Sequence, residues 1–175
     1  MKLSNVKAGP YWGVDPGKSG AAIGLYLDND GRWAVTNVVK FEDYDFADIK
    51  SIFQLAEELI EAQCVLGIER VQGMPRQSGP ASFNFGRNYG VLIGILNSRK
   101  RSKVTLLPKS AWAFLVGIPF DKRDDKEAAV ELAVRLVPDL VRYKNRAGNV
   151  PDGIAEAALI AIAAAIQESK QNAVS

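Results

Sequence analysis

The sequence contains no histidine and a single cysteine, Cys64. Without histidine, the chain has no Ser-His-Asp triad, no imidazole general base and no histidine-ligated zinc site. With one cysteine, it has no internal disulfide and no cysteine-ligated zinc cluster, which is the usage of a reducing compartment. Any catalysis must therefore depend on carboxylates, lysines, hydroxyl groups and bound metal ions.

Long apolar runs are also missing. No stretch reaches the ~18 consecutive apolar residues of a membrane span, and the N-terminal MKLSNVKAGP has no apolar signal-peptide core. The chain has 175 residues, of which 47% are apolar and 24% charged, the size and balance of one globular domain. We therefore expect a single cytoplasmic domain over residues 1–175, with a core at about 11–167 and short flexible tails, and no membrane partner.

Acidic residues are absent from the middle of the chain. Residues 71–120 contain no Asp or Glu, although 20 acids in 175 residues would put about six in a window of fifty. The whole chain carries +2 and this window +7, so the remainder carries −5. Such a basic region between acidic flanks is typical of a protein that binds a polyanion. The alternative is a chance run of solvated side chains. The basic residues are Arg76, Arg87, Arg99, Lys100, Arg101, Lys103 and Lys109.

The apolar pattern predicts alternating strands and helices. Three strands come first, at Tyr11–Asp15, Ala21–Leu27 and Trp33–Phe41. Helices and strands then alternate, and the predicted segments are a helix at Asp45–Gln63 capped by Asp45, a strand at Cys64–Ile68, a helix from Ser82 towards Ser98, a strand at Val104–Leu107, and helices at Pro108–Leu115, Asp124–Leu136 and Asp152 to about Gln167. This order indicates an α/β domain with a mixed five-stranded sheet, in which an antiparallel three-strand meander is followed by strands that cross over helices.

Glycine recurs at every fourth position of the 82–98 helix, at Gly86, Gly90 and Gly94. Each glycine costs a helix about 1 kcal/mol relative to alanine, so we expect something to approach this stripe closely. Packing against another element is the first explanation, and contact with a DNA backbone is the second. The small-residue faces of this helix and of the last helix could serve a dimer or only the core.

Four acids stand at the ends of predicted elements. Asp15 ends the first strand, Glu69 follows the fourth, and Asp152 and Glu156 share one face of the last helix. If the first and fourth strands are neighbours, Asp15 and Glu69 emerge side by side, which destabilises the fold unless a cation lies between them. Carboxylates suit Mg²⁺ or Mn²⁺, and two such ions about 4 Å apart cleave phosphodiesters without histidine. Taken singly, Asp15 could merely make the turn and Asp152 merely cap the helix.

Five motifs occur in order along residues 11–165. They are Gly13–Gly20 (GVDPGKSG), Ile68–Val71 (IERV) with Phe85–Gly90 (FGRNYG), Pro108–Trp112 (PKSAW), Asp125–Ala128 (DKEA) and Asp152–Ala157 (DGIAEA). Together they resemble the RuvC-type Holliday junction resolvases, a branch of the RNase H-like nucleases, and the pattern is closest to the short phage-type members. The first motif alone is also similar to the phosphate turn of actin-like ATPases, but that fold needs two such domains.

The resemblance implies an RNase H-like fold and a homodimeric, Mg²⁺-dependent endonuclease. Such an enzyme resolves four-way (Holliday) DNA junctions by paired symmetric nicking and leaves 5′-phosphate and 3′-hydroxyl ends. Carried over to this chain, Asp15, Glu69, Asp152 and Glu156 would hold two Mg²⁺ ions, for which Mn²⁺ would substitute. The family's terminal acids often stand three positions apart and these stand four apart, so which of the two lies nearer the metal is open. The likeness to phage-type members suggests a bacterial or phage-infected cell.

The remaining candidate residues concern DNA. Lys126, in the Asp-Lys-Glu element, could approach the scissile phosphate or could be solvated. Phe83 and Phe85 could stack on unpaired bases and are equally compatible with a core position. Trp33 and Trp112 are expected in the core. The expected contacts to the DNA backbone near the cut and along the arms are Arg76, Gln77, Arg87, Arg99, Lys100, Arg101, Lys103 and Lys109.

Two other functions remain open. One is a different RNase H-like nuclease that uses the same metal site on flaps, other branched DNA or RNA–DNA hybrids. The carboxylates do not separate it from a junction resolvase, because only the choice of substrate differs. The other is a non-catalytic DNA-binding member, which the retention of all the acids argues against.

Overall fold

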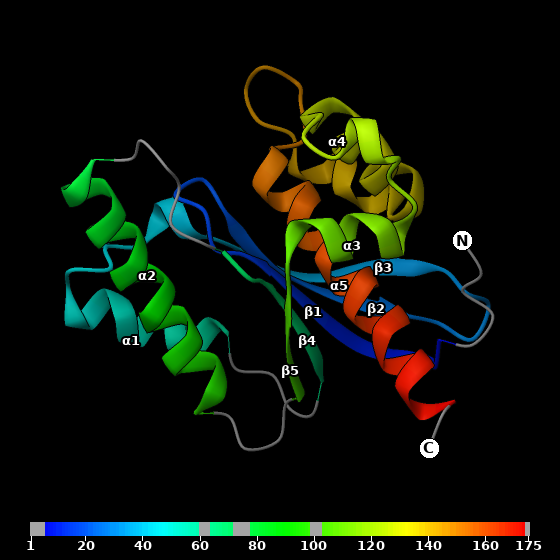
Figure 1. Ribbon diagram of the computed structural model, residues 1–175, viewed down its shortest axis with the longest axis horizontal. Helices are drawn as coiled ribbons and strands as arrows, with labels where there is room; N and C mark the ends of the chain where they lie inside the picture. Colours follow the sequence, from blue (N-terminus) through cyan, green and yellow to red (C-terminus); the bar gives the residue numbers. More distant parts are fainter. Residues whose placement is uncertain (1–5, 60–63, 72–77, 99–102, 174–175) are drawn as a thin grey trace.

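A five-stranded mixed sheet is the centre of the computed structural model, which describes residues 6–59, 64–71, 78–98 and 103–173 (Figure 1). The strands are β1 (Gly9–Asp15), β2 (Ala21–Leu27), β3 (Trp33–Lys40), β4 (Val65–Glu69) and β5 (Lys103–Leu107), in the spatial order β3-β2-β1-β4-β5. The pairs β1–β2 and β2–β3 are antiparallel, whereas β1–β4 and β4–β5 are parallel. The predicted α/β fold, with a meander followed by parallel strands, is therefore confirmed.

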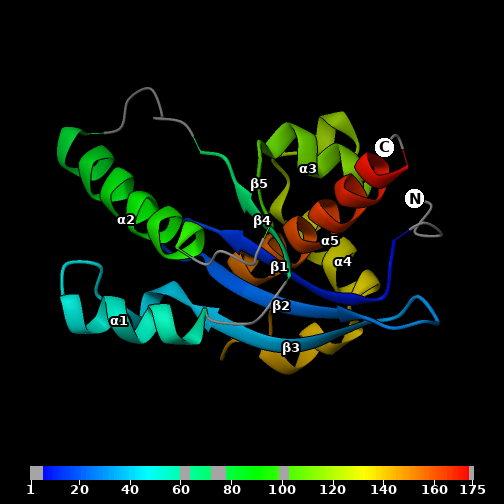
Figure 2. The same ribbon diagram turned by 90° about the horizontal axis from the view of Figure 1, so that it is seen from below.

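Helices cover both faces of this sheet. The α-helices are α1 (Ile49–Glu58), α2 (Gly79–Asn97), α3 (Lys109–Val116), α4 (Lys126–Leu136) and α5 (Asp152–Asn172), and short 3₁₀ helices occupy Phe41–Asp43, Phe120–Lys122 and Pro138–Tyr143. Figures 1 and 2 show α3, α4 and α5 on one face and α1 and α2 on the other. Two separate apolar clusters fill the spaces between the sheet and these two layers. No helix among the described residues is long and apolar enough to cross a membrane.

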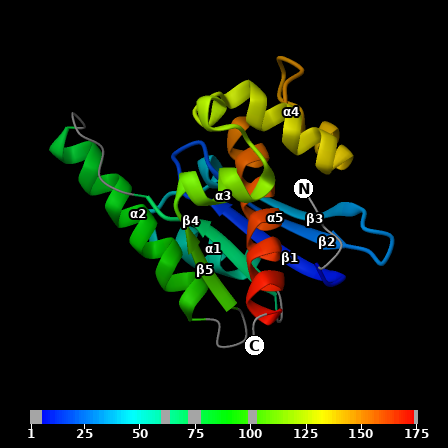
Figure 3. The ribbon, with the colours of Figure 1, turned by 45° about the vertical axis from the view of Figure 1, so that its right-hand side comes forward.

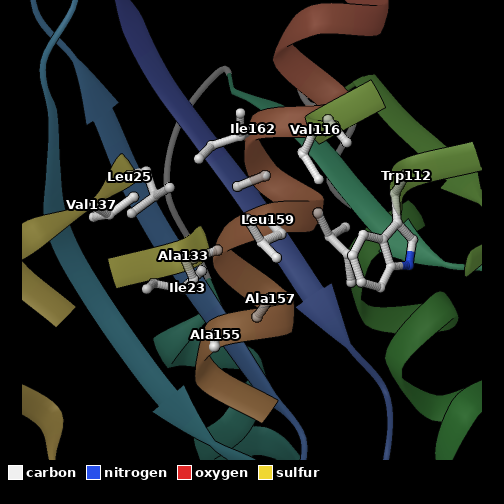
Figure 4. Packing of buried hydrophobic residues seen from close by; sticks show 14 of the residues in the cluster. Ile23, Leu25, Trp112, Val116, Ala133, Val137, Ala155, Ala157, Leu159 and Ile162 are labelled. Atoms are coloured by element: carbon white, nitrogen blue, oxygen red, sulfur yellow. The ribbon is translucent and has the colours of Figure 1, made fainter. Parts of the chain in front are cut away.

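Helix α5 is the central element of the larger cluster. It is buried at every position from Gly153 to Ile166 except Glu156, and these buried residues are almost all alanine, isoleucine or leucine. Figure 3 shows the helix lying across β1, and Figure 4 shows Leu159 and Ile162 packed among side chains from β2, α3 and α4. The small-residue face of this helix therefore belongs to the core.

Two glycines allow α5 to lie directly on the strands. A Cβ on Gly13 of β1 would come within 1.9 Å of the Ala157 carbonyl oxygen, and a Cβ on Gly67 of β4 within 2.9 Å of the Ala164 Cβ. Because no side chain separates the layers at these points, the first turns of α5 are held over the carboxyl ends of β1 and β4. This close approach places Glu156 next to the ends of the two strands.

Among the helix starts, those of α1 and α2 differ most from the prediction. The Asp48 carboxylate accepts hydrogen bonds from the N–H groups of Lys50 and Ser51 and caps α1, which therefore starts at Ile49. Asp45, the predicted cap, instead accepts the N–H of Ala47 at 2.8 Å in the preceding turn. Helix α2 starts at Gly79, ahead of the predicted Ser82, because Ser78 accepts the Ala81 N–H.

The glycine stripe of α2 has no close neighbour in the part of the chain that the structure describes. No atom outside the helix lies within 4 Å of where a Cβ on Gly86, Gly90 or Gly94 would stand. The prediction that another element packs tightly against this stripe is therefore wrong for these residues. The opposite side of α2 supplies Leu92 and Leu96 to the smaller core cluster, so the glycines face outward.

Candidate metal centre

Three carboxylates converge at the carboxyl ends of β1 and β4. Asp15 is the last residue of β1 and Glu69 the last residue of β4. The two strands pair in parallel with Val14 opposite Ile68, so the next residue of each strand reaches the same edge of the sheet. Glu156, in the second turn of α5, is the third member, and one oxygen of each of the three residues lies within 4.8 Å of the others. The predicted neighbourhood of Asp15 and Glu69 is therefore present.

Asp152 lies outside this cluster, although it is one turn from Glu156 on the same helix. Its carboxylate forms an ion pair with the Lys126 ammonium group at the start of α4. The hydrogen bond from Lys126 is the main cause that lowers the pKa of Asp152, and its partner carboxylate raises the pKa of Lys126. Of the two acids between which the sequence left the choice open, Glu156 is thus the one that lies with Asp15 and Glu69.

Burial and mutual repulsion raise the pKa values of two members of the cluster. The pKa of Asp15 is raised to about 6, chiefly by burial and further by the charges of Glu156 and Asp152, despite the N–H that Gly17 donates to it at 3.1 Å. The pKa of Glu69 is raised to about 7, again chiefly by burial and then by the charges of Asp15 and Glu156. A divalent cation would relieve this repulsion, and three carboxylates are the hard oxygen donors that Mg²⁺ and Mn²⁺ prefer. The residues present therefore fit a metal centre.

Helix α3 contributes two further side chains to the cluster. The Lys109 Nζ lies 3.2 Å from Glu156 Oε1, and the Trp112 indole N–H donates to Glu69 Oε2 at 3.3 Å. The sequence analysis predicts a DNA contact for Lys109 and a core position for Trp112. Trp112 is buried as predicted, but its contact with Glu69 was missed. Since residues three apart share one face of a helix, the spacing of Lys109 and Trp112 was the signal that could have linked them.

The other residues predicted to contact DNA lie in different parts of the structure. Phe83 is 71% exposed on α2, whereas Phe85 is only partly exposed. Arg87 of α2 and Lys18 of the turn after β1 line one hollow of about 240 Å³ beside that turn. Lys103 opens β5 at the end of the sheet opposite to the acids, where it pairs with Glu168 and Gln171. The remaining candidates, Arg76, Gln77, Arg99, Lys100 and Arg101, lie outside the described residues.

A larger groove lies at the Lys126–Asp152 ion pair. It has a volume of about 620 Å³ and lies between α4 and the segment that leads into α5, with Lys126 and Asp152 among its lining residues. Valines 130, 134, 141 and 150 contribute apolar surface to the same groove. Concave surface is thus present both on the α2 side and on the α4 side of the carboxylates.

Comparison with known proteins gives no match by sequence and clear matches by structure. No protein-family model matches the chain, and no curated protein does. The structure of Thermus thermophilus RuvC has a TM-score of 0.63 at 12% identity, covering 93% of this chain and 97% of that one. The same protein in complex with a Holliday junction substrate has a TM-score of 0.59 at 12% identity, covering 93% and 96%.

A eukaryotic protein has a similar structure. The yeast mitochondrial Holliday junction resolvase has a TM-score of 0.57 at 16% identity, with 97% of this chain and 87% of that chain covered. At such low identity the likeness concerns the fold, and it extends over nearly the whole chain. The chain therefore has the RuvC-type fold, an RNase H-like architecture, and the resemblance inferred from its motifs is confirmed at that level.

Proposed function

We propose that the chain is a metal-dependent endonuclease that resolves four-way DNA junctions by paired symmetric nicking. The observation that carries this proposal is the cluster of Asp15, Glu69 and Glu156 at the strand ends of a RuvC-type fold. The Thermus thermophilus protein of that fold has been solved with a Holliday junction substrate, which supports branched DNA as the substrate here. The products would carry 5′-phosphate and 3′-hydroxyl ends.

Asp15, Glu69 and Glu156 would hold two Mg²⁺ ions, with Mn²⁺ as a substitute. When bound, such ions activate water for in-line attack and neutralise the leaving 3′ oxygen. Asp152 could reach the second ion only if Lys126 releases it, and Lys126 would then be free to contact the scissile phosphate. Lys109 keeps one positive charge beside the three carboxylates, which lowers the pKa values of both Asp15 and Glu69 and favours their ionised, metal-binding forms.

The DNA would approach across the α2 side of the cluster. Arg87 and Lys18 line the hollow next to the Asp15 turn, where they could neutralise phosphates close to the cut. Phe83 projects from the first turns of α2 and could stack on unpaired bases at the junction centre. Lys103 is less suited to this path, because it lies at the other end of its strand and is already paired with Glu168.

Symmetric nicking needs two active sites, and a second copy of the chain would supply the other one. Helix α2 offers a surface for that copy, because the Cβ positions of Gly86, Gly90 and Gly94 meet no neighbouring element of the described chain. Ile49 and Phe53 of α1, on the same side of the sheet, are 66% and 64% exposed. An open glycine stripe and exposed apolar side chains on one side of the sheet favour close contact with a second copy.

The experiment that tests the proposed activity is a nicking assay on a labelled, immobile four-way junction. Linear duplex, a flap and an RNA–DNA hybrid serve as competing substrates, each with Mg²⁺, Mn²⁺ or EDTA. The natural chain is compared with Asp15→Asn, which removes a cluster carboxylate, and with Asp121→Asn, which removes an exposed one in the 3₁₀ helix at Phe120–Lys122. We expect paired nicks on the junction that disappear in EDTA and in Asp15→Asn but persist in Asp121→Asn.

Each of the other outcomes has a definite meaning. Cleavage of flaps or hybrids in preference to junctions would support the proposed metal centre and indicate a different RNase H-like activity. Junction binding without cleavage under either metal would contradict a nuclease and leave a DNA-binding role.

A further inference from the structure

Two elements that supply cluster carboxylates are connected through α3. Trp112 donates its indole N–H to Glu69 of β4, and Lys109, one turn earlier, pairs with Glu156 of α5. The Lys109 ammonium group also lies 5.9 Å from the centre of the Trp112 ring, within cation–π range. A continuous chain of contacts thus runs from Glu69 through Trp112 and Lys109 to Glu156.

The Trp112 ring is held by its surroundings. Trp112 is 0% exposed and belongs to the same core cluster as Leu159 and Val116. Figure 4 shows the ring among these residues, with its nitrogen on the side turned away from Leu159. Its backbone N–H is fixed as well, because it donates to the Pro108 carbonyl at 3.1 Å in the first turn of α3. A tryptophan ring so enclosed keeps its N–H pointed in one direction.

The glutamate that receives this hydrogen bond has more freedom of its own. Glu69 is the partly buried last residue of β4, which lies between β1 and β5, and a glutamate side chain has three rotatable bonds before its carboxylate. An indole nitrogen is only a donor, so the contact selects carboxylate positions in which Oε2 faces the ring. The second oxygen of the same carboxylate can then ligate a cation between Glu69, Asp15 and Glu156.

We propose that Trp112 is a positioning residue of the metal centre, which fixes the Glu69 carboxylate for metal binding while its ring seats Lys109 beside Glu156. This inference rests on the metal centre of the proposed function and is independent of which DNA is cut. Hydrogen bonds to the outer side of metal ligands commonly change metal affinity by 10–100-fold, so the effect is large enough to measure.

Calorimetric titration with Mn²⁺ tests the proposal without any DNA. Trp112→Phe removes the N–H and keeps an aromatic ring in the core, and we expect it to bind Mn²⁺ about 10-fold more weakly. The matched control is Trp33→Phe, because Trp33 is also a buried tryptophan and its indole N–H has no partner among the described residues. This control should bind Mn²⁺ within twofold of the natural chain. Circular dichroism and a denaturation curve establish that both variants are folded.

Terbium provides a spectroscopic measurement of the same contact. An indole next to a Tb³⁺ ligand transfers excitation to the ion, so the natural chain and Trp33→Phe should give sensitised Tb³⁺ emission. Trp112→Phe should lose most of that emission even at Tb³⁺ concentrations that saturate its weakened site. The emission locates the indole beside the bound ion, and the Mn²⁺ titration tests its role, because a purely structural role for Trp112 in the core would leave the Mn²⁺ affinity unchanged.

The outcomes separate this proposal from the proposed function. Equal Mn²⁺ affinity in folded Trp112→Phe and the natural chain would overturn the positioning role, whatever DNA is cut. Failure of the natural chain to bind Mn²⁺ would overturn it together with the metal centre. Weakened Mn²⁺ binding in Trp112→Phe, combined with an inability of the natural chain to cut junctions, would support the positioning role and contradict the resolvase activity.

Discussion

At the scale of single residues, the metal-free protein carries an electrostatic cost in its carboxylate cluster. The pKa of Asp15 is about 6 and that of Glu69 about 7 in the folded chain, each above its ordinary value because burial disfavours the charged form. Between the ordinary and the raised pKa, the folded protein binds more protons than the unfolded chain. The free energy of unfolding therefore falls as the pH rises through roughly 4 to 7.

This cost predicts a stabilising substitution. In EDTA at pH 8, Asp15→Asn should raise the free energy of unfolding, because it removes one desolvated and repelled charge. We expect an increase on the order of 2 kcal/mol, or a melting temperature higher by about 4–8 °C. The advantage should shrink or reverse at pH 4, where Asp15 of the natural chain is protonated.

Thermal unfolding followed by circular dichroism at the two pH values checks this prediction. Asp121→Asn removes an exposed carboxylate and should show no such pH-dependent gain. Equal melting temperatures for Asp15→Asn and the natural chain in metal-free buffer at pH 8 would contradict the repulsion argument.

At the scale of elements, the sequence predicts the strands better than the contacts between layers. The ends of β1 and β4 can be predicted because apolar runs stop at Asp15 and Glu69. Since the two strands are parallel neighbours, both acids then lie at the same edge of the sheet. Which acid of α5 joins them depends on the rotation of the helix about its axis. That rotation is set by the contact of Ala157 with Gly13, a tertiary feature that no local pattern reveals.

The same limit explains what was missed on α3 and α1. A tryptophan in an apolar segment is correctly predicted to be buried, but the partner of its N–H depends on which strand lies next to it in space. Trp112 finds Glu69, which is 43 residues away in sequence. On α1, Asp45 and Asp48 are both good capping residues, and only the folded turn shows that Asp48 has the free N–H groups of the helix within reach.

The contact between α5 and β1 gives a prediction at this scale. Gly13→Ala would place a methyl group 1.9 Å from the Ala157 carbonyl oxygen and 2.4 Å from the Ala161 nitrogen, both backbone atoms that cannot rotate away. The helix must then move off the strand, and we expect the free energy of unfolding to drop by about 3 kcal/mol or more. Urea denaturation measures the change.

Helix displacement should also separate Glu156 from the two strand acids. Gly13→Ala is therefore expected to lose Mn²⁺ affinity even under conditions in which it is still folded. Gly79→Ala is the matched control, since an added Cβ there meets no atom within 4 Å. If Gly13→Ala were as stable as this control, α5 could not lie as closely on β1 as described.

At the scale of the whole molecule, the proposed dimer can be tested through the open face of α2. Gly90→Arg puts a long charged side chain at the middle of the glycine stripe, where it meets no neighbouring element of the described chain. The fold should therefore tolerate it, while close approach of a second copy should not. We expect sedimentation to report a dimer for the natural chain and a monomer for Gly90→Arg, with unchanged circular dichroism.

The nicking pattern should change in parallel. A monomer has one active site, so Gly90→Arg should introduce single nicks into a four-way junction in place of paired nicks. Asn84→Arg adds the same charge at an exposed position on another side of α2 and should remain dimeric. A dimer that persists in Gly90→Arg would show that the two copies meet through another surface.

The order in which the chain supplies its three clustered acids has a consequence for biosynthesis. Asp15 and Glu69 emerge from the ribosome well before their partner Glu156, which lies in α5, the helix that packs on β1. A nascent chain that has not yet placed α5 on β1 has only two of the three carboxylates in position. The carboxylate cluster is therefore assembled late, and shortened translation products that end before α5 cannot complete it.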